Sequence, residues 1–157
     1  MKTRPEHLIS QLNLRPHPEG GHYSEIYRSN SKVGFENRQR ESLTSIYFLL
    51  EKGQVSRWHL VDADEVWHFY EGGKLELFIM PPDLSKVEMI MLGEVGDHVK
   101  PVHVVPAGWW QAARATGEYA LCGCTVAPAF EFAGFRFLNE EEKRKVNELG
   151  NAASSLI

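Results

Sequence analysis

The chain has few cysteines, no long apolar run and no cluster of basic residues. Only 2 of its 157 residues are cysteines, too few for the disulfide framework that supports small secreted domains. No stretch approaches the roughly 20 apolar residues that a membrane helix requires, and no charged segment followed by an apolar one opens the chain. The formal net charge of -4 argues against nucleic acid, because phosphates require a basic face. We therefore expect a soluble, cytoplasmic protein that meets neither a membrane nor nucleic acid.

The sequence contains no internal repeat and no sign of a second domain. Its 157 residues, 43% of them hydrophobic, suffice for one globular domain with a substantial core. We expect a single domain over residues 1–157, with its core from about 12 to 137. Cys122 and Cys124 share one face of a predicted strand, where adjacent positions do not favour a disulfide, so both thiols are expected to be reduced and buried.

Short strand-like segments separated by turn residues make up most of the chain. Pairs such as Gly72-Gly73 and Pro81-Pro82 supply the turns. Many short, regularly spaced strands favour an all-β jelly-roll barrel. The predicted strands cover residues 44–50, 55–61, 65–70, 74–80, 87–92, 102–105, 109–113 and 119–126, with a first strand from His22 and a last one within 130–137.

The ends of the chain carry helix signals. A residue that caps helices is twice followed, three positions later, by glutamate, which is the spacing of a capping box. The remaining predicted segments are a helix over 4–12 capped by Thr3 and Glu6, a helix after Asn139 with Glu142, a loop or arm over 29–42, and a frayed tail over 150–157.

The stretch from Gly53 to Gly72, GQVSRWHLVDADEVWHFYEG, places ionisable side chains among bulky apolar ones. Alternate side chains of a strand share a face, so Arg57 and His59 point to the same side. After a turn at 62–64, Glu65 points to that interior too if the two strands pair as neighbours in one sheet. An imidazole and a carboxylate that converge in an apolar space predict a metal half-site or an acid–base dyad.

This stretch resembles the first motif of the cupin superfamily: Gly, five residues, His, any residue, His, three or four residues, Glu, six residues, Gly. Gly53, His59, Glu65 and Gly72 match that motif, and Val61 stands where its second histidine belongs.

The PAGWWQ segment is similar to the second cupin motif, in which a Pro-x-Gly turn is followed after two residues by a histidine. Pro106 and Gly108 match, and Gln111 stands in place of the histidine. Metal-dependent cupins resemble one another in a set of three histidines and one glutamate. Of that set, only His59 and Glu65 remain here.

The HPEGG segment at residues 17–21, with the Tyr-x-Glu-x-Tyr-Arg strand after it, is similar to the cupin subfamily DUF985, also known as cupin type 5. WHLVDADEVWHFYEG and PAGWWQ resemble the same subfamily, so the resemblance covers roughly residues 12–137. It implies the cupin double-stranded β-helix, a jelly-roll barrel with short N- and C-terminal helices, and little settled chemistry. Cupins commonly pair, so it also implies a homodimer.

Each candidate of the central stretch has a functional and a structural interpretation. His59 is a site residue or a hydrogen-bonded core histidine. Glu65 is costly to bury unless it is paired or metal-bound, and otherwise ends a loop outside the barrel. Arg57 offers a fork for carboxylate or phosphate if it points inward, and is otherwise a surface cation. Gln111 is a weak metal ligand and a good hydrogen-bonding group, or an amide satisfied by the barrel wall.

Three aromatic or acidic side chains are candidates for ligand binding. Tyr23 and Glu25 share a face of the first strand and would close one mouth of the pocket, unless that strand is an ordinary half-exposed one. The ring of Trp67 would stack on a sugar or a base, although such rings are more often core.

Three functions remain open. The first is a metal-independent epimerase or isomerase for a sugar or sugar nucleotide. In this function His59 is the base, Arg57 stabilises an enolate oxygen and Glu65 orients the base. These roles resemble those in the deoxysugar epimerases, which share the barrel fold. The second is an oxygenase or isomerase with a divalent metal on His59, Glu65 and Gln111. The third is a binding protein without turnover. The two missing histidines favour the first and the third, so we predict a barrel that binds a small polar, sugar- or nucleotide-like molecule, with epimerase-like chemistry as an option and a divalent metal as the less favoured alternative.

Overall fold

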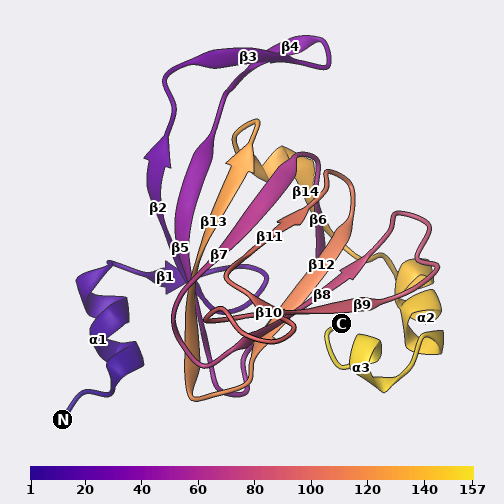
Figure 1. Ribbon diagram of the computed structural model, residues 1–157. Coiled ribbons are helices and arrows are strands. Elements are labelled where there is room, and N and C mark those ends of the chain that lie inside the picture. The colour runs from indigo at the N-terminus through magenta and orange to yellow at the C-terminus, as the bar shows by residue number, and fades with distance from the viewer.

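The computed structural model describes residues 1–157 as two six-stranded β-sheets that face each other, with short helices outside them (Figure 1). All strand pairs are antiparallel except β9 with β10. In spatial order, the first sheet consists of β1 (Arg15–Pro16), β2 (His22–Arg28), β5 (Thr44–Glu51), β13 (Tyr119–Ala127), β7 (Asp64–Gly72) and β11 (Val102–Val105). The second consists of β10 (Val99–Lys100), β9 (Glu88–Leu92), β8 (Leu75–Met80), β12 (Trp110–Ala115), β6 (Val55–Val61) and β14 (Phe135–Phe137). The predicted all-β jelly roll with short terminal helices is confirmed.

Alternation along the strands builds the core between the sheets. Phe48 and Leu50 of β5 point inward together with Trp67 of β7, because side chains two residues apart share a face. Cys122 and Cys124 of β13 join this cluster as buried free thiols, as predicted. The apolar cluster fills one part of the space between the sheets.

The helices pack on the outer faces of the two sheets. The capping box of Thr3 and Glu6 begins α1 (Arg4–Gln11), whose Leu8 packs on the first sheet. The second capping box, Asn139 with Glu142, begins α2 (Glu140–Glu148). Both caps were predicted. No helix combines the length and the apolar character needed to span a membrane.

The C-terminal tail is ordered, so the prediction that it frays is wrong. It forms α3 (Asn151–Ser154) and covers the outer face of the second sheet. The indole of Trp58 donates to the carbonyl of Ala153 at 2.8 Å, and Leu156 is fully buried among Trp58 and its neighbours. The local sequence of the tail does not determine its structure. Contacts with Trp58, almost a hundred residues earlier in the chain, hold it in place.

The predicted loop over 29–42 is a β-hairpin, formed by β3 (Lys32–Phe35) and β4 (Arg38–Glu41). It projects beyond the barrel as an arm (Figure 1). The buried guanidinium of Arg40 fixes the base of the arm, because its Nε donates to the carbonyl of Ala129 at 2.7 Å and its Nη2 to Asp62 at 2.9 Å.

The two strands of the central stretch do not pair as neighbours, so the condition under which His59 and Glu65 were expected to converge is not met. β6 pairs with β12 and β14, whereas β7 pairs with β13 and β11. The turn between them therefore crosses from one sheet to the other. His59 and Glu65 still reach the same interior, but they do so from opposite sheets.

Candidate functional site

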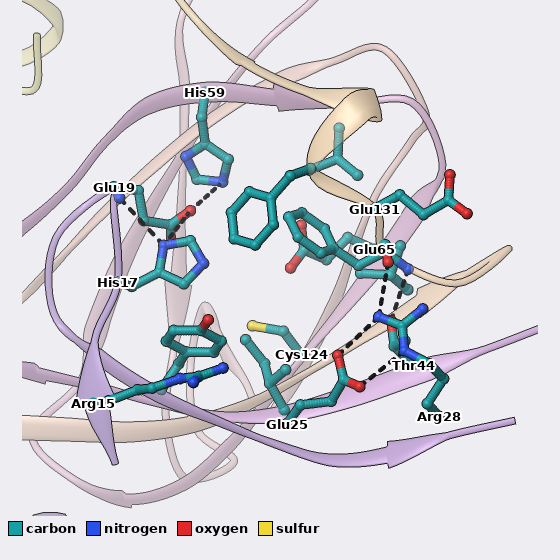
Figure 2. Close-up of a pocket in the computed structure, with 16 residues that line it drawn as sticks. Arg15, His17, Glu19, Glu25, Arg28, Thr44, His59, Glu65, Cys124 and Glu131 are labelled. Atoms are coloured by element: carbon teal, nitrogen blue, oxygen red, sulfur yellow. Dashed lines mark hydrogen bonds and ion pairs between the residues drawn. The ribbon is translucent and has the colours of Figure 1, made fainter.

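A cavity of about 400 Å³ lies between the two sheets, and both His59 and Glu65 line it (Figure 2). Its walls come from β2, β5, β6, β7 and β13, from residues 15–19, and from residues 130–132. Val61, at the position of the missing histidine, is part of the apolar wall.

The tautomer of His59 follows from its hydrogen bonds. Its Nδ1 lies 2.7 Å from the carbonyl oxygen of Arg57, and since a carbonyl only accepts, Nδ1 carries the proton. Burial lowers the pKa of His59, so the ring is neutral and its Nε2 has a free lone pair. That Nε2 lies 3.0 Å from the Oε2 atom of Glu19.

Glu19 is a buried carboxyl group that keeps its proton. Burial raises its pKa to about 8, although the hydroxyl of Ser56, which donates to Oε1 at 2.9 Å, and the charge of Arg57 act in the opposite direction. Near neutral pH the protonated Glu19 donates to the Nε2 of His59. The two residues therefore form a couple that shares one proton.

A glycine allows Glu19 to reach this position. Gly20 has φ of +117°, and a Cβ added there would lie 2.0 Å from the carbonyl oxygen of Val55 on β6. Only glycine combines this conformation with such a close approach of two backbones. The turn thus holds the segment of residues 15–19 against β6.

His17 is a neutral histidine beside the couple. Its Nδ1 accepts from the backbone N–H of Glu19 at 3.2 Å, so its proton resides on Nε2. Burial, with a smaller contribution from His59, lowers the pKa of His17 to about 3. Its ring meets that of Tyr23 edge to face, with centroids 4.5 Å apart.

Glu65 is the second carboxyl group of the cavity, and buried side chains outside the cavity lining hold it in place. Burial raises its pKa to about 7. Gln111 donates to its Oε2 at 2.5 Å, and the amide oxygen of Gln111 accepts from the indole of Trp67 at 2.7 Å. Trp67 and Gln111, predicted to touch a ligand, are buried outside the cavity lining and position Glu65 instead.

The other predicted residues divide between the cavity and the surface. Tyr23 and Glu25 line the cavity. Arg57 does not: its exposed guanidinium donates to the carbonyl of Pro18 at 2.7 Å and lies 4.5 Å from the ring centroid of Phe137. Alternation fixes the direction in which a side chain starts, but a long arginine side chain can still end at the surface.

The predicted metal set of His59, Glu65 and Gln111 does not fit a metal ion. Both ends of the Gln111 amide are engaged, by Trp67 and by Glu65, and the Nε2 of His59 faces Glu19. Nowhere in the chain do three or more His, Cys, Asp or Glu side chains form a group that could hold a metal ion. The residues of this set therefore do not supply a metal site.

Sequence reasoning missed His17 and Glu19 as site residues. Both belong to the HPEGG segment, where two ionisable residues precede a glycine pair. That spacing indicated a special turn but not that the turn lies against β6. The sequence also gave no sign that the segment at Phe130 to Phe132 forms part of the wall.

The comparisons with known proteins agree with this fold. The chain matches the family model described as Cupin superfamily (DUF985) over residues 6–138. A hypothetical protein from Leishmania major has a TM-score of 0.85 and 27% identity, with 98% of this chain and 97% of that chain covered. A protein from Shewanella oneidensis has a TM-score of 0.86 and 30% identity, with coverage of 99% and 97%.

A more distant likeness concerns the fold alone. Oxalate decarboxylase from Bacillus subtilis has a TM-score of 0.60 and 16% identity, and the match covers 95% of this chain but 36% of that one. A comparison with the curated proteins found no match. Because the family model spans residues 6–138, the chain belongs to the cupin superfamily, in the family described as DUF985.

Proposed function

We propose that the protein binds a small polar, sugar- or nucleotide-like molecule in the cavity and acts on it as a metal-independent isomerase or epimerase. The observation that supports this most directly is that two buried carboxyl groups, Glu19 and Glu65, line one cavity together with His59. Buried carboxyl groups with raised pKa values are the groups that enzymes use for proton transfer near neutral pH.

The different surroundings of the two carboxyl groups divide their tasks. Glu65 accepts a hydrogen bond from Gln111, which favours its carboxylate form, and serves as the base. Glu19 holds its proton against the Nε2 of His59, so the Glu19–His59 couple serves as the acid. This assignment replaces the one based on the sequence, in which His59 was the base and Arg57 stabilised the enolate.

The proposed reaction moves protons only. Glu65 takes a proton from a carbon next to a carbonyl group, and the electron pair of that C–H bond forms a carbon–carbon double bond. The electron pair of the carbonyl π bond moves to oxygen, which takes the proton of the Glu19–His59 couple, and an enol results. Return of the proton held by Glu65 to the other face of the same carbon gives an epimer, and the enol O–H then gives its proton back to the couple. Where that carbon carries a hydroxyl group the intermediate is an enediol, and return of the Glu65 proton to the former carbonyl carbon gives an isomer. In that case the couple takes its proton from the hydroxyl that becomes the new carbonyl, so no oxidant is needed.

Deuterium exchange tests this function. Keto sugars and sugar nucleotides are first screened for binding by thermal shift, and the bound ones are incubated in D₂O and followed by NMR. We expect exchange of the hydrogen next to the carbonyl, and a loss of about 100-fold or more in Glu65→Gln and in Glu19→Gln. Glu148→Gln, on the exposed face of α2, is the matched control and should keep the wild-type rate.

Alanine variants separate a site role from a structural one. His59→Ala and Glu65→Ala should abolish binding or exchange while circular dichroism shows an intact fold. Unfolding of both variants would remove the support for a site. Binding by the wild type without any exchange would contradict the catalytic proposal and leave a binding protein.

A further inference from the structure

The charged groups around the cavity are paired with one exception. Arg28 is engaged by Glu25, with two nitrogen–oxygen distances of 2.9 Å, and also donates to the carbonyl of Phe130 at 3.0 Å. Glu131 is held by Arg38 at 2.6 Å. Arg15 lines the same cavity, and its guanidinium takes part in none of the hydrogen bonds or ion pairs of the chain.

The position of Arg15 is fixed by the sheet. Its backbone on β1 pairs in register with Tyr23 on β2, and its guanidinium carbon lies 5.2 Å from the centroid of the Tyr23 ring. The same ring contacts His17, whose Nδ1 accepts from the backbone N–H of Glu19. Figure 2 shows Arg15 on the same side of the cavity as His17 and Glu19. Arg15 is therefore linked to the acid couple through two ring contacts, first with Tyr23 and then with His17.

We propose that Arg15 binds an oxyanion of the ligand, either a carboxylate or a phosphate, and so holds the reactive carbon of the ligand against Glu19 and Glu65. The inference rests on the proposed function and names its substrate class, a small acidic sugar-like molecule. A guanidinium matches the oxygens of both anions with two parallel N–H donors. Contact with the Tyr23 ring orders the arginine before the ligand arrives, which lowers the entropy lost on binding.

The surroundings of Arg15 favour an anion. The negative charges of Glu25 and Glu131 are balanced by Arg28 and Arg38. Glu19, on the same side of the cavity as Arg15, keeps its proton and so adds no negative charge there. An anionic ligand therefore meets one uncompensated positive charge at Arg15.

Three related sugars test the inference: galactose, galacturonate and galactose 1-phosphate. We expect the wild type to bind at least one of the two anionic sugars about tenfold or more tightly than galactose. Arg15→Gln should lose this difference without losing affinity for galactose. Arg144→Gln, which removes an exposed charge on α2, should retain it. A preference for galacturonate assigns a carboxylate, and a preference for galactose 1-phosphate assigns a phosphate.

Simple anions provide a second readout for the case in which no sugar binds. Inorganic phosphate and acetate are titrated separately while the Nε–Hε signal of Arg15 is followed by NMR. A saturable shift that is specific to this arginine supports the inference, and no shift with either anion overturns it. Equal binding of charged and neutral sugars, or an anion preference that survives in Arg15→Gln, also overturns it. Deuterium exchange reports on the proposed function separately, so the failure of one can be told from the failure of the other.

Discussion

Gln111 stands at the position of the histidine in the second cupin motif, and its amide serves a different purpose from a metal ligand. It accepts from the indole of Trp67 and donates to Glu65, so the three side chains form one hydrogen-bonded chain from the core to the cavity. The donated bond also lowers the pKa of Glu65, which opposes part of the increase due to burial. Gln111 therefore both orients the proposed base and keeps its pKa near neutrality.

Replacement of Gln111 by leucine tests how much this hydrogen-bonded chain contributes to stability. In Gln111→Leu the indole N–H of Trp67 and the Oε2 of Glu65 both lose their partner, so we expect the free energy of unfolding to fall by about 1–3 kcal/mol. Urea denaturation measures the change. Gln39→Leu, at an exposed position of β4, provides the control and should change stability little. A Gln111→Leu protein as stable as the wild type would contradict the role of the amide.

Sequence reasoning found the residues that local alternation determines and missed those that depend on distant contacts. His59 and Glu65 were predicted correctly to face the interior because strand parity alone decides the face. Glu19 was not predicted, because it lies in the turn between β1 and β2, which has no periodicity, and its partner His59 lies far along the chain on β6. Arg57 begins on the expected face, but Pro18 and Phe137 draw its guanidinium to the surface.

At the scale of elements, the limits of the strands could be predicted from the sequence, whereas the pairing of the strands could not. The predicted limits of β6 and β11 agree with the structure, because alternation and turn residues are local signals. The assignment of β6 and β7 to different sheets is not local, since it depends on β12, β13 and the other strands that pair with them. For the same reason the arm over 29–42 became recognisable as a hairpin only through the structure.

The C-terminal segment offers a test of an element that sequence reasoning judged wrongly. Leu156→Ala should lower the free energy of unfolding by about 2–5 kcal/mol, because Leu156 is fully buried beside Trp58 and the substitution leaves a cavity. Leu149→Ala, at a residue that is 37% exposed, should cost much less. Urea denaturation followed by tryptophan fluorescence reports on both variants. Equal stability of the two would mean that the tail is frayed after all.

At the scale of the whole molecule, the polar cavity affects stability as well as function. The predicted homodimer stays a prediction, and size-exclusion chromatography with light scattering would show a monomer if it is wrong. Stability, in contrast, has a pH dependence that follows from the buried groups. Two carboxyl groups with raised pKa values and two histidines with lowered ones lie within one enclosed space, and the two kinds of group act in opposite pH directions.

The direction of each effect follows from proton binding. The carboxyl groups of Glu19 and Glu65 have pKa values of about 8 and about 7 in the folded chain, against 4.5 in the unfolded one. Folding therefore retains protons that the unfolded chain releases, and this part of the stability is lost as the pH rises from about 4.5 through 7 to 8. The pKa of His17 falls from 6.5 to about 3, and the pKa of His59 is lowered too. Below pH 6.5 the histidines of the unfolded chain become protonated, whereas those of the folded chain stay neutral. Stability is therefore also lost as the pH falls below 6.5.

We therefore expect stability to change least between about pH 4.5 and 6.5, where the two effects oppose each other, and to decline on both sides. Urea denaturation at half-unit intervals from pH 4 to 9 measures the curve. Each proton contributes a slope of up to about 1.4 kcal/mol per pH unit, so Glu65→Gln, which cannot titrate, should flatten the decline above pH 6.5. The exposed control Glu148→Gln should leave that slope unchanged. If Glu65→Gln declined as steeply as the wild type, Glu65 would not hold its proton in the folded chain, and the separate roles of the two carboxyl groups would have to be abandoned.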